Sequence, residues 1–204
     1  MFNFDYSIFK IIVGWKNKTH NLQNRIVMTN TELLKKIRKG FNEVQKETAI
    51  NRQKGWTEAF FTVLKKIGNE QGFKVYTSSA NEKISPKEGG GEWLFDLCWS
   101  FERPGNDDWK KDYKGLKLIC ECEWKMNSDE IIYDFQKLAV GKAELKIMIV
   151  QYKSEEQFNE FKTSCEKSVD KKLCADDAEY ILIGSGNAKD DTEIKWEKLW
   201  ITNF

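Results

Sequence analysis

Residues 116–125 read LKLICECEWK, a stretch in which apolar and charged side chains largely alternate. Such alternation is typical of a β-strand, because successive side chains point to opposite faces of a sheet. Two interpretations of the charged face stay open: a solvated strand face, or carboxylates and an ammonium gathered for chemistry. Neighbouring acids on one face repel each other by ~0.2–1 kcal/mol, so we expect a cationic group nearby. One face would carry Leu118, Cys120, Cys122 and Trp124, and the other Ile119, Glu121, Glu123 and Lys125.

Helix and strand patterns follow one another on either side of this stretch. Apolar residues recur at helical spacing over 31–41 and 56–67, and Gly72 is placed to end the second helix. We expect strands over 73–79, 92–102, 146–152, 178–186 and 193–202, and helices over 129–145 and 154–170. A meander of strands followed by strands that alternate with helices predicts an α/β fold. Its mixed central sheet would be flanked by helices on both faces.

Length and composition set limits on the chemistry. The chain has 204 residues, a formal net charge of +1, a single histidine (His20) and five cysteines without a C-x-x-C pair. One histidine argues against Ser-His, Cys-His and His-ligated zinc chemistry. We interpret the cysteines as reduced, buried thiols of a cytoplasmic protein. No apolar run approaches the ~20 residues of a membrane span. We expect residues 1–27 to be an extension outside the fold and residues 28–204 to form one domain.

A lone acid interrupts the apolar stretch EWLFDLCWSFE at residues 92–102. Burying Asp96 among such neighbours is costly unless the carboxylate is paired or binds a metal ion. If this strand pairs with residues 116–125, Asp96 can lie beside Glu123. Two carboxylates and Lys125 on one sheet face would then suit a hard divalent cation, which prefers oxygen ligands.

An acid on one strand, E-x-K on the next, then an amphipathic helix and an apolar strand resemble the PD-(D/E)xK restriction-endonuclease-like nuclease superfamily. Asp96 matches the first acid, Glu123-Trp124-Lys125 match E-x-K, and Glu58 matches the acid that the family often has on the preceding helix. The resemblance spans about residues 56–150. The chain departs from the family pattern in four ways. Phe95 stands where the motif has Pro, and the gap from Asp96 to Glu123 is long. Glu121 is an additional acid, and three other acids compete for the first position: Asp107, Asp108 and Asp112.

The resemblance implies an αβββαβ core and Mg²⁺-dependent hydrolysis of phosphodiester bonds in nucleic acid, most readily DNA, with Mn²⁺ as a substitute for Mg²⁺. It implies that Asp96, Glu123 and the backbone carbonyl of Trp124 hold the metal ion. Lys125 would orient or deprotonate the attacking water, or steady the phosphate. On the following helix, Gln136 and Lys137 are candidates for a phosphate contact, although a solvated helix face is the simpler interpretation of these two residues.

Two other classes of function stay open. A catalytically inactive module of the same fold would bind nucleic acid or a protein partner, and the many aromatic residues would suit a protein partner. An unrelated α/β interaction protein would leave Glu121, Glu123 and Lys125 merely solvated. Stabilisation by Mg²⁺ or Mn²⁺ would separate these alternatives from a metal-dependent enzyme. Among partners we expect nucleic acid and no membrane, and a homodimer is compatible with the sequence.

Overall fold

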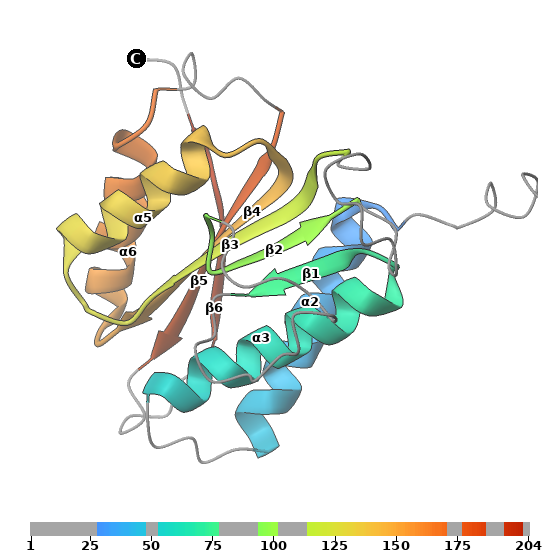
Figure 1. The fold of residues 1–204 in the computed structure, drawn as a ribbon. Coiled ribbons are helices and arrows are strands. Elements are labelled where there is room, and N and C mark those ends of the chain that lie inside the picture. Colours follow the sequence, from blue (N-terminus) through green and yellow to red (C-terminus); the bar gives the residue numbers. More distant parts are fainter. Residues whose placement is uncertain are drawn as a thin grey trace, which may run out of the picture.

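The computed structural model describes residues 28–47, 53–77, 94–101, 114–170, 177–186 and 194–201. These residues form four helices and six strands, and all six strands belong to one sheet (Figure 1). The helices are α2 (Asn30–Glu47), α3 (Gln53–Glu70), α5 (Ser128–Val140) and α6 (Glu155–Lys167). The strands are β1 (Lys74–Thr77), β2 (Leu97–Ser100), β3 (Leu116–Glu123), β4 (Ala143–Tyr152), β5 (Glu179–Gly186) and β6 (Lys195–Leu199).

The strands lie in the sheet in the same order as in the sequence. Strands β1, β2 and β3 form an antiparallel meander, β3, β4 and β5 run parallel, and β6 returns antiparallel to β5. Each parallel connection needs a crossover, which α5 supplies between β3 and β4 and α6 between β4 and β5. Crossovers of the same hand that advance in the same direction put both helices on one face of the sheet.

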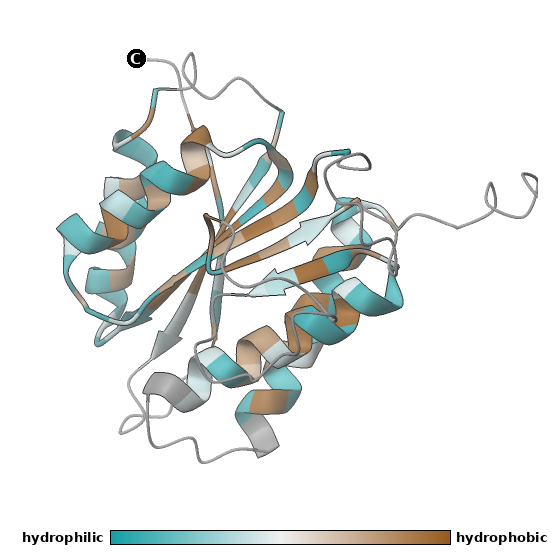
Figure 2. Cartoon of the chain, viewed as in Figure 1, coloured by the Kyte–Doolittle hydropathy of each residue, from teal (hydrophilic) through white to brown (hydrophobic). Residues whose placement is uncertain are grey.

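Two apolar cores fill the space between the sheet and its two layers of helices. On one face α2 and α3 pack through Ile37, Phe41, Phe60 and Leu64, among others, against the sheet. On the other face the core includes Ile131 and Phe135 of α5 and Phe158 and Phe161 of α6. Strand β4 is buried on both faces, as its sequence AELKIMIVQY indicates. Figure 2 shows the apolar residues gathered along the strands and on the helix sides that face them.

The predicted order of elements and the mixed sheet with helices on both faces are confirmed. Gly72 ends α3 as predicted, with a φ of 76°. The second predicted strand is shorter than its apolar pattern: β2 begins at Leu97, so Asp96 lies just before the strand instead of within it. The expectations for residues 1–27 and for Asp107, Asp108 and Asp112 fall outside the described residues.

No helix in the described segments combines the length and the apolar character needed to cross a membrane.

Helix α3 packs tightly against the sheet at Gly68, so we expect Gly68→Ala to destabilise the fold by about 1–3 kcal/mol. A Cβ atom at this position would lie 2.6 Å from Val75 Cγ2 and 2.8 Å from Trp99 Nε1. This crowding should outweigh the gain in helix propensity, which is ~1 kcal/mol. Urea unfolding of the two variants Gly68→Ala and Asn69→Ala measures the effect. Asn69 is the exposed neighbour on α3, so a loss of equal size in both variants would contradict the packing argument.

Candidate functional site

The two faces of β3 meet different helices at the carboxyl end of the strand. On one face, the indole of Trp124 donates a hydrogen bond from Nε1 to Thr57 Oγ1 of α3 at 2.6 Å. On the other face, Lys137 of α5 lies 2.9 Å from Glu121, measured from Nζ to Oε1. The charged face of LKLICECEWK is therefore not an open solvated surface at Glu121, because α5 covers it there. The expected cationic partner of the neighbouring acids is Lys137.

Asp96 lies against β3, immediately before the first residue of β2. The last paired residues at this end are Leu97 of β2 and Cys120 of β3. Beyond them, Asp96 Oδ2 accepts a hydrogen bond from the backbone N–H of Cys122 at 2.9 Å. This contact holds the carboxylate of Asp96 beside the residue that separates Glu121 from Glu123. Strands β2 and β3 are adjacent and antiparallel, as the proposed pairing of the two acids requires.

The E-x-K residues Glu123–Lys125 lie where β3 ends and the chain bends toward α5. Glu123 is half-buried, and its Oε1 accepts a hydrogen bond from the backbone N–H of Lys125 at 2.6 Å. The side chain of Lys125 is 71% exposed, and its Nζ lies 3.5 Å from Glu130 Oε1 of α5. Between them, the ring of Trp124 stacks near Phe60, with 6.3 Å between ring centroids. An exposed lysine therefore follows the anchored carboxylate of Glu123.

The three remaining candidates from the sequence lie at different places. Glu58 is exposed on α3 and follows Thr57, whose contact with Trp124 places this turn of the helix beside the end of β3. Gln136 turns toward the end of α6, where its Nε2 lies 3.4 Å from the carbonyl oxygen of Ser168. Lys137 contacts Glu121, so its side chain is engaged within the protein instead of lying on a solvated helix face.

Glu121 is the residue whose environment the sequence did not reveal. Its side chain is only 1% exposed. Burial raises the pKa of its carboxyl to about 8, with Asp96 adding to the rise and the ammonium of Lys137 opposing it. Strong shifts of this kind often accompany functional sites. The sequence showed Glu121 as an additional acid on the correct face, but its burial depends on how α5 docks.

The cysteines of β3 contribute no nucleophile to this site. Cys120 and Cys122 point to the face that packs on α3. Burial raises the pKa of both thiols well above the ordinary value, and the charge of Asp96 raises it further. Both groups therefore stay protonated near neutral pH, and a protonated thiol is neither a good nucleophile nor a good metal ligand.

The carboxylates at the end of β3 are of the ligand type that a hard divalent cation prefers. Carboxylate and carbonyl oxygens are the ligands such ions prefer, and Asp96, Glu121 and Glu123 supply them at one end of the sheet. One oxygen of Glu121 is buried and has only the ammonium of Lys137 as a partner among the described residues, so it has capacity for a further partner. Within the described ranges, no three His, Cys, Asp or Glu side chains are already gathered closely enough to hold a metal ion. The oxygen ligands are of the type that such an ion prefers. The three carboxylates would have to move closer together to bind it.

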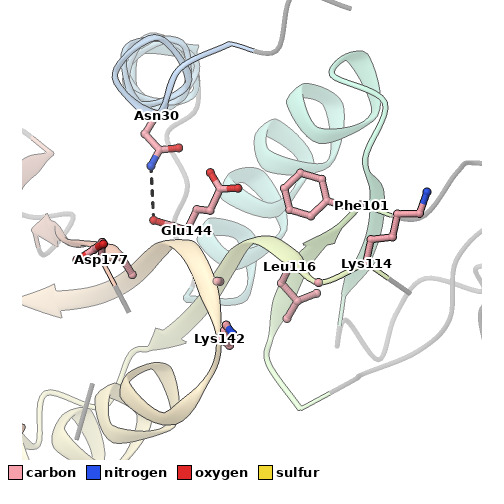
Figure 3. A pocket seen from close by; sticks show the side chains of 10 residues that line it. Asn30, Phe101, Lys114, Leu116, Lys142, Glu144 and Asp177 are labelled. Atoms are coloured by element: carbon pink, nitrogen blue, oxygen red, sulfur yellow. Dashed lines mark hydrogen bonds between the residues drawn. The ribbon is translucent and has the colours of Figure 1, made fainter. Parts of the chain in front are cut away.

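A hollow of about 650 Å³ lies at the opposite end of the strands (Figure 3). Its walls include Leu116 at the start of β3, Glu144 near the start of β4, and Asp177 before β5. Asn30 of α2 closes one side and donates from Nδ2 to the carbonyl oxygen of Glu144 at 3.5 Å. None of the candidate residues lines this hollow, so it belongs to a separate part of the molecule.

Comparison of the chain with protein-family models, with curated proteins and with solved structures gives no match. The geometry at the ends of β2 and β3 and the resemblance of the motif are therefore the observations that point to a function.

Proposed function

We propose that this protein hydrolyses phosphodiester bonds of nucleic acid, most readily DNA, in a metal-dependent reaction. The observation that carries the proposal is the position of Asp96, whose carboxylate is held against the β3 backbone between Glu121 and Glu123. Lys125 follows at the exposed edge of the same turn. The order α3, β1, β2, β3, α5, β4 supports the proposal further, because the PD-(D/E)xK resemblance implies an αβββαβ core.

The residues would divide the work as follows. Asp96, Glu123 and the backbone carbonyl of Trp124 would hold Mg²⁺, for which Mn²⁺ can substitute. When bound, such an ion stabilises charge on the attacked phosphate and lowers the pKa of water. Asp96 and Glu123 are oriented before binding, since each accepts a backbone hydrogen bond. Lys125 is exposed and pairs with Glu130 at 3.5 Å, so it can turn its ammonium toward the phosphate or the attacking water.

A second candidate is a non-catalytic module of the same fold that binds a protein partner. It is favoured by two exposed apolar side chains on α5, Tyr133 and Val140. They are seven residues apart and therefore lie on the same side of the helix, two turns from each other. Such a module would have no use for the carboxylates and lysine at the end of β3.

Incubation of the purified chain with supercoiled plasmid, single-stranded DNA and RNA tests the proposed activity. We expect cleavage of at least one substrate with Mg²⁺ or Mn²⁺ and none with EDTA. Because the metal supplies both the charge stabilisation and the activated water, its removal should abolish the reaction completely. Cleavage that persists in EDTA would contradict the metal dependence. A complete lack of cleavage with both metals would favour the binding module.

A further inference from the structure

Glu121 is buried in an unusual way for an acidic residue. Its side chain is 1% exposed, and the cation beside it is Lys137 of α5, with 2.9 Å between Oε1 and Nζ. Apart from this ammonium, Oε1 has no hydrogen-bond partner among the described residues. Buried charges are normally both paired and hydrogen-bonded, because the cost of removing them from water is large. The ammonium of Lys137 is therefore the one partner of Oε1 among the described residues.

The position of Glu121 connects it to the proposed metal site. The β2–β3 register ends at the pair Leu97 and Cys120, and Asp96, one residue earlier, accepts a hydrogen bond from the backbone N–H of Cys122, next to Glu121. The contact of Lys125 with Glu130 puts that side chain on the α5 face, the face that Glu121 shares. Because side chains alternate along a strand, Glu123 lies on the same face as Glu121 and Lys125. Glu121 thus lies beside the proposed ligands and contacts α5 through Lys137.

Lys137 has a second acidic partner besides Glu121. Its side chain is 35% exposed, so it reaches Glu121 from the solvent side of the cluster. The same Nζ also lies 3.2 Å from Asp134 Oδ1, one helical turn earlier on α5. If another cation took the carboxylate of Glu121, the ammonium would keep Asp134 as its partner. The exchange would leave neither charge unpaired.

We propose that Glu121 is a ligand of the divalent cation, and that Lys137 neutralises Glu121 until the cation displaces its ammonium. This inference rests on the proposed function for the identity of the site, and it adds a ligand and a built-in competitor that the E-x-K motif does not contain. Because a metal ion and the ammonium compete for one carboxylate, removal of the ammonium should strengthen metal binding, and removal of the carboxylate's charge should weaken it.

Calorimetric titration of the full chain with Mn²⁺ at one fixed pH tests the competition. We expect Lys137→Met to bind Mn²⁺ about tenfold more tightly than the wild type, and Glu121→Gln to bind it at least about tenfold more weakly. Lys162→Met is the matched control, since Lys162 of α6 is 28% exposed and lies 2.9 Å from Glu197 of β6 in an ion pair. Its Mn²⁺ affinity should equal that of the wild type. Lys137→Gln repeats the test with a polar side chain in case the methionine variant does not fold.

Unchanged Mn²⁺ affinity in the folded Lys137 and Glu121 variants would overturn the inference, and so would a wild-type chain that binds no Mn²⁺. The nuclease assay separates this result from a failure of the proposed function. If the wild type cleaves DNA but the affinities do not change, only the role of Glu121 and Lys137 is wrong. If the affinities change as expected but no substrate is cleaved, the metal site stands and the proposed activity is wrong.

Discussion

Asp96→Asn is expected to lower metal-dependent cleavage by about 10³-fold while the protein stays folded. The substitution removes the negative charge that the metal ion needs. It keeps a side-chain oxygen that can accept the hydrogen bond from the backbone N–H of Cys122, which Asp96 accepts at 2.9 Å. Alanine would lose this hydrogen bond as well and would confuse a structural loss with a chemical one. Asparagine therefore isolates the charge.

Plasmid nicking with Mg²⁺ and the Mn²⁺-dependent shift of the melting temperature measure the effect of Asp96→Asn. Both should be lost together, because one carboxylate serves both. Asp129→Asn is the matched control: Asp129 is an exposed acid in the first turn of α5, and its loss should cost only a few tenths of a kcal/mol of helix stability. If Asp96→Asn nicks plasmid as fast as Asp129→Asn does, Asp96 is not a metal ligand.

The arrangement of the sheet could be predicted because hydrophobic patterning determines it locally. The alternation in LKLICECEWK correctly separates the side chains of Cys122 and Trp124 from those of Glu121 and Lys125. The continuous apolar run of β4 similarly indicates a strand that is buried on both faces. These signals need no knowledge of distant partners. Helix crossovers then follow from the parallel strands.

The details of the site depend on contacts between distant segments, which local patterns do not encode. The apolar run around Asp96 suggested that the acid lies inside a strand, whereas β2 begins only at Leu97. Likewise, the solvated-face interpretation of Lys137 followed from its helix alone. The docking of α5 over β3 brings its ammonium to Glu121 instead. Repulsion between two acids predicted that a cation would be near, but not which residue would supply it.

Lys125→Ala is expected to lower cleavage by about 10²-fold or more and to leave metal binding intact. A protonated lysine has no lone pair for a metal ion, so its contribution belongs to the transition state and not to assembly of the site. Its contact with Glu130 is an exposed ion pair at 3.5 Å, and pairs of this kind contribute less than about 1 kcal/mol to stability. The variant should therefore fold like the wild type, which makes a loss of activity interpretable.

Lys39→Ala controls for removing an exposed lysine from an ion pair, since Lys39 lies 3.9 Å from Glu43 on the surface of α2. The Mn²⁺ melting shift and plasmid nicking are compared for Lys125→Ala, Lys39→Ala and the wild type. We expect all three to show the same melting shift and only Lys125→Ala to nick slowly. Because metal binding and cleavage separate in this one variant, it distinguishes a catalyst from a metal-binding module. Nicking by Lys125→Ala at the wild-type rate would mean that the lysine of ECEWK takes no part in the reaction.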